Sequence, residues 1–395
     1  MNSLVSIYVL VFCANWIVIY SYLIWSRARL PLFQQETADL PPLQAPWPKL
    51  SIIIPACNEA EHLESALRSL LAQDYPALEL VIINDRSTDA TREILNRLAM
   101  TDARIKAIHI TTLPEGWLGK VHALQQGIQQ ASGDWLLFTD ADVHFSSGIL
   151  RRAMAYLQHH QVDHLALMPS MVLNNFWLAV CVHAFAQLFF LTTRAAEVNQ
   201  VDSKRFIGVG AFNLVRASVF NSTPGFEWLR LEPGDDAGVG LLLKQAGAKS
   251  HFAIAIQDLS VPWYSSVGAM FRGLEKNLFG PGSHYQWWRM LWQVSSLWLL
   301  VAAPLVGLYL GVWRGAGFML AAAISVIILQ LVFSIYCVYE QRVETLRLLF
   351  FPLGMLLFSL MMLRAGYKCL KNGGIDWRGT HYPLDQLRAG QRVKF

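Results

Sequence analysis

Long apolar runs near both ends set the main constraint on this 395-residue chain. The first, from Leu4 to Trp25, is uncharged and long enough to cross a bilayer. Three more lie close together near the C-terminus, at about residues 290–312, 318–338 and 348–363. Only 15% of all residues are charged, whereas a soluble protein has about 25%. We therefore expect a membrane protein with spanning helices at both ends and a folded domain between them.

The composition divides the chain into five segments. Residues 1–26 are expected to be a retained membrane anchor, because no cleavable signal pattern is present. The arginines that follow, Arg27 and Arg29, place its C-terminal end in the cytoplasm. Beyond it we expect a proline-rich linker (27–48), a cytoplasmic domain (49–285), transmembrane helices (286–366) and a basic tail (367–395). Three crossings would put this tail outside, which conflicts with the cytoplasmic preference of Lys and Arg.

Residues 175–191 are apolar and aromatic, but they also contain His183 and Gln187. We interpret this segment as a helix that lies in the membrane interface; a buried core helix is the alternative. The aromatic side chains expected to face the lipid are Phe176, Trp177, Phe185, Phe189 and Phe190.

Charge and cysteine content exclude two other classes of protein. The net charge of +4 gives no case for nucleic-acid binding. The five cysteines are scattered and form no Cys/His cluster typical of a zinc site.

Within residues 49–285, short strands of β-branched residues alternate with amphipathic helices. Such alternation predicts an α/β fold with a mostly parallel sheet and helices on both faces. The expected strands are 50–54, 80–83, 105–110 and 135–138, and the expected helices are 61–72, 88–98, 120–130 and 148–158.

Two carboxylates, Asp140 and Asp142, directly follow the expected strand 135–138. The carboxyl ends of strands in an open α/β sheet are where ligands bind. Two acids placed there need positive charge beside them, and a hard divalent cation with a phosphate-bearing ligand would supply it. We expect Asp140 and Asp142 to hold Mg²⁺ or Mn²⁺, with Asp140 also contacting the sugar or ribose.

Polar residues after the other strands are further candidates. Asn58 and Glu59 follow the first strand, and Asp85 follows the second, where it can accept hydrogen bonds from a base or a ribose. A turn or a helix cap is the alternative for each of these positions. Lys120 opens the helix after the third strand, where backbone N–H groups attract phosphate.

A second acidic pair, Asp235 and Asp236, precedes a helix much later in the chain. We select Asp236 as a general base that takes a proton from an acceptor hydroxyl, with Asp235 as the next choice. Helix capping by either acid is the alternative. Gly210 lies in a stretch of small residues that would let a substrate approach the backbone.

Four motifs in order resemble family 2 glycosyltransferases with the GT-A fold. They are the segments Ser51–Glu59 and Asn84–Asp89, the pair Asp140 and Asp142, and the pair Asp235 and Asp236. The segment 113–120 is similar to the hopanoid-associated and carotenoid-pathway branch and, more distantly, to ceramide glucosyltransferases. The resemblance covers about residues 50–280.

This resemblance implies an inverting transfer from a nucleotide-diphosphate sugar to a lipid, at the cytoplasmic face of a bacterial inner membrane. It implies substrate-binding roles for Pro55, Asn58, Glu59, Asp85, Lys120, Asp140, Gly210, Arg272 and Lys276. The (Gln/Arg)-x-x-Arg-Trp motif of processive members is absent from the matching stretch 271–277, where Arg272 and Lys276 can face the diphosphate. The tail 376–382 resembles a Trp-basic-Gly-Arg-x-Tyr signature, with Thr380 in place of Arg.

Three other functions remain open. A polyprenyl-phosphate glycosyltransferase would share the mechanism and differ only in the acceptor. A processive polysaccharide synthase needs a polymer channel, for which the chain has few spans. A nucleotide-sugar-binding membrane protein without activity is a different class, because fold alone does not prove catalysis.

Overall fold

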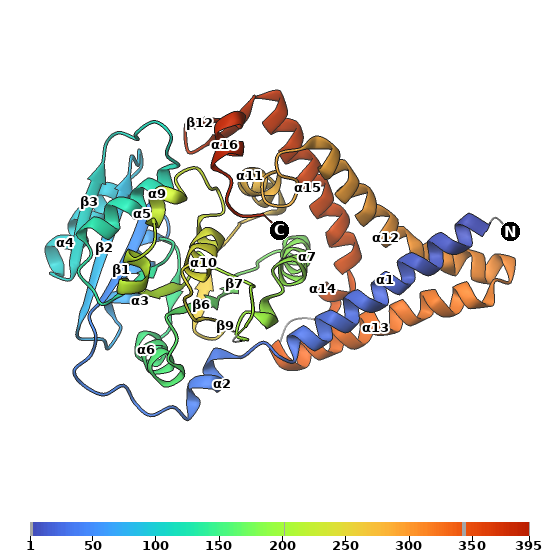
Figure 1. Ribbon diagram of the computed structural model, residues 1–395, viewed down its shortest axis with the longest axis horizontal. Coiled ribbons are helices and arrows are strands. Elements are labelled where there is room, and N and C mark those ends of the chain that lie inside the picture. The colour runs from blue at the N-terminus through green and yellow to red at the C-terminus, as the bar shows by residue number, and fades with distance from the viewer. Residues whose placement is uncertain (1–2, 201, 342–344, 395) are drawn as a thin grey trace.

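The computed structural model describes residues 3–200, 202–341 and 345–394 (Figure 1). It has a mixed α/β domain and a group of long helices beside it. The helices are α1 (Ser3–Arg27), α2 (Phe33–Ala38), α3 (Leu63–Leu71), α4 (Thr91–Thr101), α5 (Gly119–Gln130), α6 (Ile149–His160), α7 (Phe176–Thr193), α8 (Ala217–Asn221), α9 (Gly225–Trp228), α10 (Asp235–Gln245), α11 (Val267–Leu278), α12 (Trp287–Arg314), α13 (Gly317–Gln341), α14 (Thr345–Leu349), α15 (Phe351–Lys371) and α16 (Leu384–Gly390), with a 3-10 helix at Ala195–Glu197.

A seven-stranded sheet in the order β3-β2-β1-β4-β8-β6-β9 forms the centre of the domain. All pairs are parallel except those that β8 makes with β4 and β6. This confirms the expected mostly parallel sheet. The strands are β1 (Leu50–Ala56), β2 (Leu78–Asp85), β3 (Ile105–Ile110), β4 (Trp135–Phe138), β5 (His144–Phe145), β6 (His164–Met168), β7 (Ser170–Met171), β8 (Asn213–Arg216), β9 (Ser250–Ile254), β10 (Leu259–Val261), β11 (Gly374–Trp377) and β12 (Thr380–Pro383).

The strands β1 and β2 are almost wholly buried, since helices cover both faces of the sheet. The side chains on one face of β1, Ile52 and Ile54, pack into a core with α3 and α6, whereas Ile53 on the other face packs into a core with α5. The carboxyl ends of β1, β2 and β4 point to the same edge of the sheet. That edge carries the polar residues discussed below.

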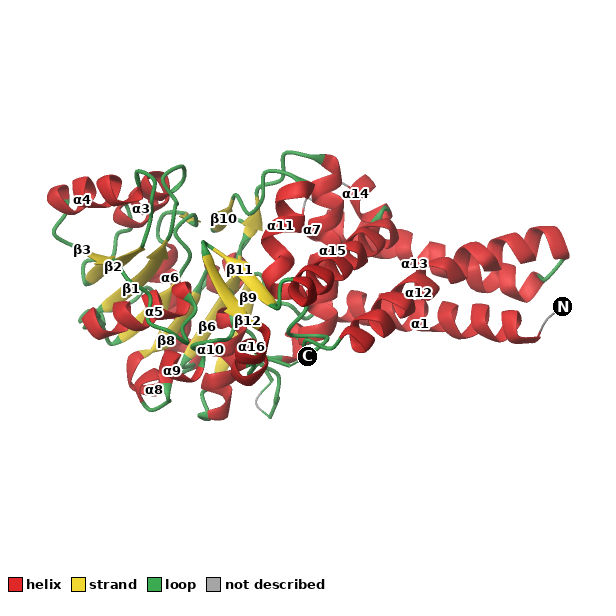
Figure 2. Cartoon of the chain, turned by 90° about the horizontal axis from the view of Figure 1, so that it is seen from above, coloured by secondary structure: helices red, strands yellow, loops and turns green. Residues whose placement is uncertain are grey.

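Three of the long helices project away from the domain together (Figure 2). The helices α12 and α13 form an antiparallel hairpin, and α1 packs against both. Gly307 and Gly311 on α12 permit the close approach, because a Cβ on Gly311 would lie 2.4 Å from that of Leu320. Only 22–28% of the most apolar windows of these three helices is buried in protein, so most of their surface is free to contact lipid.

A side chain from α1 replaces a helical hydrogen bond that a proline removes from α12. Pro304 has no N–H group, so the carbonyl of Leu300 one turn earlier loses its helical partner. The indole Nε1 of Trp16 donates a hydrogen bond to this carbonyl at 2.7 Å, and the contact is buried. An unpaired carbonyl in an apolar environment is costly, so this bond fixes the position of α1 against α12.

The helices α7 and α15 differ from the other three, although both are long and apolar enough to span. About half of each is buried, 44% of the window in α7 and 50% of that in α15, and they pack against each other. The expectation that five aromatic residues of α7 face lipid is wrong for two of them. Phe185 packs on Trp263 and Phe358, and Phe190 is buried beside Phe252, because α7 lies between α15 and the domain.

The tail folds back onto the domain. The backbone N–H groups of Arg392 and Val393 donate to Glu232 at 2.7 and 2.9 Å. An arrangement that keeps both the tail and the domain on one side of a membrane requires an even number of crossings by the chain between them. The hairpin of α12 and α13 would provide two such crossings, whereas α15 packs on α7 and α11.

Topology can be tested with an impermeant maleimide on intact cells. We expect Arg314→Cys, at the exposed turn between α12 and α13, to be labelled from the side opposite the domain. Ala389→Cys in the tail should be labelled only after permeabilisation. Labelling of Ala389→Cys in intact cells, with the parent chain unlabelled, would contradict this arrangement.

The Trp16–Leu300 bond can be tested with a matched rescue. We expect Trp16→Phe to lower the melting temperature in detergent, by a loss worth about 1 kcal/mol. Pro304→Ala restores an N–H group for Leu300, so the double variant should lose less than the sum of the single changes. Additive losses would show that the indole acts by packing alone.

Candidate active site

One cavity of about 1330 Å³ lies at the carboxyl edge of the sheet. It collects the candidate residues from separate loops. Those that line it are Pro55, Glu59, Asp85, Lys120, Asp140, Asp142, Gly210, Asp235, Asp236, Arg272 and Lys276. Asn58 is the exception.

Asn58 holds two loops together, and it does not line the cavity. Its side-chain oxygen accepts a hydrogen bond from the backbone N–H of Thr88 at 2.8 Å, and its own N–H donates to Ser87. The residue lies in the left-handed region with φ of 57°, which Asn tolerates better than most residues. The geometry therefore assigns it a structural contact between the loops after β1 and β2.

Asp85 is buried at the end of β2, and its neighbour Arg86 occupies both of its oxygens. The guanidinium donates to Oδ1 at 2.8 Å and to Oδ2 at 3.2 Å. Gly119 is required opposite this pair, because a Cβ there would lie 2.4 Å from Oδ2 of Asp85. The Asp85–Arg86 pair, held together by two hydrogen bonds, therefore gives this end of the cavity a polar surface.

Lys120 lies between two acids that come from different parts of the chain. Its ammonium is 2.8 Å from Asp140 and 3.2 Å from Asp235. Burial alone would lower the pKa of Lys120, but the two carboxylates raise it well above its ordinary value. Lys120 therefore remains charged and compensates the acidic cluster.

Gly210 connects the two acidic pairs through its backbone. Its carbonyl accepts from the N–H of Asp140 at 3.0 Å, and its N–H donates to Oδ2 of Asp236 at 3.1 Å. A Cβ at this position would lie 2.6 Å from Oδ2 of Asp140. The expected close approach to the backbone of Gly210 is thus made by these aspartates.

Asp142 is the acid with the least compensation. No described side chain forms a hydrogen bond or ion pair with its carboxylate in residues 3–200, 202–341 and 345–394. Burial, together with the nearby charges of Asp140 and Glu59, raises the pKa of Asp142 to about 7. A carboxylate in this position is stabilised by added positive charge.

A divalent cation suits this pair of acids. Within the part of the chain that the structure describes, no group of three or more His, Cys, Asp or Glu residues forms a complete metal site. Mg²⁺, however, is usually held by one or two carboxylates together with substrate phosphates and water. Asp140 and Asp142 supply those carboxylates, and Asp142 has the uncompensated charge that a cation would neutralise.

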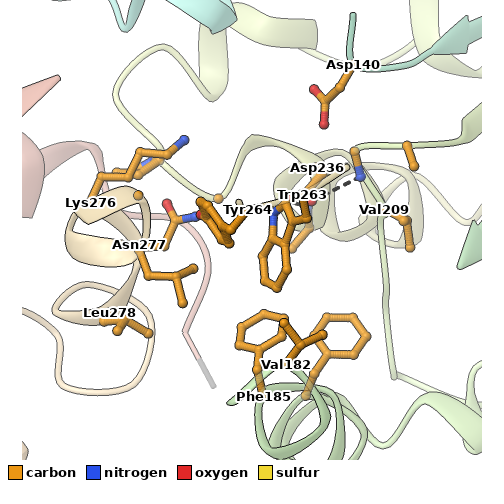
Figure 3. Close-up of a pocket in the computed structure, with 18 of the residues that line it drawn as sticks. Asp140, Val182, Phe185, Val209, Asp236, Trp263, Tyr264, Lys276, Asn277 and Leu278 are labelled. Atoms are coloured by element: carbon orange, nitrogen blue, oxygen red, sulfur yellow. Dashed lines mark hydrogen bonds between the residues drawn. The ribbon is translucent and has the colours of Figure 1, made fainter. Parts of the chain in front are cut away.

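Asp236 and Lys276 face the cavity from opposite elements (Figure 3). The pKa of Asp236 is raised, mainly because the carboxyl group is buried and in addition because of the negative charge of Asp235. The pKa of Lys276 is lowered to about 8, mainly because the ammonium is buried and in addition because of the positive charge of Lys120. The ammonium of Lys276 lies 3.7 Å from the centre of the Trp377 ring.

The far end of the cavity is apolar. Figure 3 shows Val182 and Phe185 of α7 below the acidic end, with Trp263 between them and Asp236. Leu297 of α12 and the α15 residues Phe358 and Met362 continue this wall. The cavity therefore joins a charged end at the sheet with an apolar end among the long helices.

Several lining residues were not identified from the sequence. Arg86 lies inside the motif segment Asn84–Asp89 but was not selected as a site residue, and no motif includes Trp263 or Tyr264. Trp377, Arg378 and Tyr382 belong to a tail pattern that was noticed without being placed at the site. That pattern was their only signal, because Arg378 and Tyr382 lie more than 200 residues from the partners that they contact, and Trp377 lies about 100 residues from Lys276.

Residues 51–222 match the family model described as Glycosyl transferase family 2. The GalNAc(5)-diNAcBac-PP-undecaprenol beta-1,3-glucosyltransferase of Campylobacter jejuni is 36% identical over 107 residues, which are 27% of this chain and 34% of that protein. The beta-monoglucosyldiacylglycerol synthase of Synechocystis sp. is 27% identical over 190 residues, 44% of this chain and 39% of that protein. The chain thus spans 34–39% of the length of these relatives.

A solved structure extends the likeness to nearly the whole chain. The mannosyltransferase PcManGT from Pyrobaculum calidifontis, in complex with GDP-Man and Mn²⁺, aligns with a TM-score of 0.54 and 16% identity. The alignment covers 93% of this chain and 99% of that one. The shared fold is a GT-A-type sheet, which confirms the fold expected from the four motifs.

Because the carboxylate of Asp142 lacks a cationic partner among the residues that the structure describes, we expect its replacement by a neutral side chain to stabilise the folded protein, by an amount that depends on pH. Its folded pKa of about 7 lies above its unfolded value of about 4, so the folded state loses stability as the pH rises between these two values, and the loss is complete above pH 7. We expect Asp142→Asn to raise the melting temperature in detergent with chelator, more at pH 8 than at pH 5.

Mn²⁺ should raise the melting temperature of the unsubstituted protein and change that of Asp142→Asn much less. Asp74→Asn, at an exposed ion pair with Arg151, is the matched control. A lower melting temperature for Asp142→Asn at pH 8 would show that the carboxylate is compensated in the folded state.

Proposed function

We propose that the protein is a membrane-bound inverting glycosyltransferase that moves a sugar from a nucleotide-diphosphate sugar to a lipid acceptor. The observation that carries this proposal is the single cavity that joins the acidic cluster to an apolar wall of α7, α12 and α15. A lipid acceptor needs both environments, because its reacting head must reach the charged end while its chain stays in apolar surroundings.

The donor would bind at the carboxyl ends of β1 and β2, near Pro55, Glu59 and the Asp85–Arg86 pair. Asp140 and Asp142 would hold Mg²⁺ or Mn²⁺, which when bound neutralises charge on the diphosphate. The relative from Pyrobaculum calidifontis was solved with GDP-Man and Mn²⁺. Lys276 is a further cation at this end, and Arg272 lines the same cavity.

Asp236 would act as the general base. As the acceptor hydroxyl attacks the anomeric carbon, its proton moves to the Asp236 carboxylate and the bond from that carbon to the diphosphate oxygen breaks. Gly210 and Ala237 donate backbone N–H groups to this carboxylate and orient it. The raised pKa of Asp236 suits a proton acceptor at near-neutral pH. Asp235, in contrast, is paired with Lys120.

The proposed acceptor is a lipid whose reacting head reaches Asp236 at the charged end of the cavity. The names of two relatives contain an undecaprenol-linked saccharide and a glucosylated diacylglycerol. The motif resemblance favours a hopanoid, carotenoid or sphingolipid-like acceptor, and a polyprenyl phosphate would use the same site. Arg27 at the end of α1 and Arg29 just beyond it favour a cytoplasmic location of the domain.

Transfer of label into lipid tests this function. Membranes that contain the protein would be incubated with labelled UDP-glucose, UDP-N-acetylglucosamine or GDP-mannose and Mn²⁺, and lipids extracted. We expect one donor to label a lipid, and Asp236→Asn to reduce the rate by about 100-fold or more, because the proton acceptor is lost.

Asp74→Asn should keep the unsubstituted rate, and chelation should abolish transfer. Donor binding without any labelled lipid would move the acceptor to another class of molecule. Equal rates for Asp236→Asn and the unsubstituted protein would overturn the assignment of the base. If the protein shows no donor binding and no sugar transfer, the proposal that it is an enzyme is overturned.

A further inference from the structure

The C-terminal hairpin of β11 and β12 contacts three separate loops around the donor end of the cavity. Arg378 donates to the carboxylate of Glu59 at 2.7 Å and to the carbonyl of Cys57, both after β1. Arg86, after β2, donates to the hydroxyl of Thr380 at 3.2 Å. The N–H of Gly119, at the start of α5, donates to the hydroxyl of Tyr382 at 3.3 Å.

The hairpin also contributes side chains to the cavity itself. Trp377, Arg378 and Tyr382 all line it. The ammonium of Lys276 on α11 lies over the ring of Trp377. Lys276 lines the end of the cavity at which we place the diphosphate. A cation over an aromatic face is held in place without a carboxylate that would compete with a phosphate for its charge. Trp377 therefore orients Lys276 and leaves it available to an anion.

The geometry of the turn favours the contacts of Arg378. The two residues between the paired Trp377 and Thr380 are Arg378 and Gly379, with φ of 49° and 77°. Two residues with positive φ are typical of a type I′ turn, in which Asn and Gly are preferred. An arginine is sterically unfavourable there, and its contacts with Glu59 and Cys57 compensate for this.

The base of the hairpin is anchored independently. Arg388 donates to the carbonyl of Tyr285 at 2.9 Å, and Gln391 donates to the carbonyl of Gly280 at 2.7 Å. These contacts lie outside the donor end of the cavity. The hairpin is thus fixed at one end by the tail and attached to the donor loops at the other by Arg378, Thr380 and Tyr382.

We infer that this hairpin forms a wall of the nucleotide-diphosphate site. Arg378 is a positioning residue that holds it closed, and the Trp377–Lys276 pair presents a cation to the diphosphate. The inference rests on the proposed function. It assigns to the site a tail segment more than 300 residues away from the loop that it contacts.

Nucleotide affinity tests the inference on the full-length protein in detergent. The dissociation constants of UDP and GDP with Mn²⁺ would be measured by calorimetry, and the donor KM and kcat by transfer. We expect Arg378→Ala to weaken nucleotide binding and raise KM by about tenfold, with a smaller change in kcat at saturating donor. Arg378→Lys should recover part of the affinity.

Arg97→Ala is the matched control, because it removes an exposed arginine that pairs with Glu64, and neither residue lines the cavity. It should leave nucleotide affinity unchanged. If the unsubstituted protein binds nucleotide and Arg378→Ala binds equally well, the inference is overturned while the proposed function stands. If the unsubstituted protein binds neither nucleotide and transfers no sugar, both are overturned.

Cys57 provides a second readout that does not depend on activity. It is half-buried beneath Arg378, whereas Cys13, Cys181, Cys337 and Cys369 are buried. Burial raises the pKa of the Cys57 thiol and the charge of Arg378 lowers it. Loss of Arg378 would therefore slow alkylation through the thiol chemistry, so faster alkylation can only come from greater access.

We expect maleimide to label Arg378→Ala severalfold faster than the unsubstituted protein, and nucleotide with Mn²⁺ to slow labelling of the latter. Labelling should disappear in Cys57→Ser, which identifies the reacting thiol. Equal labelling rates with and without Arg378 would show that the hairpin does not cover this loop and would overturn the inference.

Discussion

The arrangement of the site depends on a cluster of aspartate carboxylates at the carboxyl edge of the sheet. Asp140, Asp142, Asp235 and Asp236 share one cavity, and buried like charges are tolerated only when cations compensate them. Lys120 compensates two of them directly. The glycines around the cluster follow from the same constraint, because the acids approach the backbone too closely for any side chain at Gly210.

Much of the domain could be predicted because its causes are local. Alternating β-branched and amphipathic segments determine β1 to β4 and the helices between them, and parallel strands bring their carboxyl ends to one edge. This places Asp140 near Glu59 without any knowledge of the coordinates. The partners of Asn58 and Asp85 were not predicted, since each depends on the conformation of an adjacent loop. The pairing of Arg378 with Glu59 depends on where the chain returns after the membrane helices.

Hydropathy was a weaker guide to the helices outside the sheet. It identifies segments that are apolar and long enough to cross, but protein neighbours can cover an apolar surface as well as lipid does. The helices α12 and α15 both satisfy the criterion, and only their surroundings separate them. The same reason explains Phe190, which is buried in the domain and does not face the membrane.

The return of the tail also has a consequence for biosynthesis. Glu59 lies in the first loop of the domain and Arg378 lies close to the end of the chain, 319 residues later. The sheet can form while the later part of the chain is still being translated, but the hairpin can contact Glu59 only after the long helices that precede it have been synthesised. A nascent or truncated chain would therefore have a folded sheet and an open nucleotide pocket.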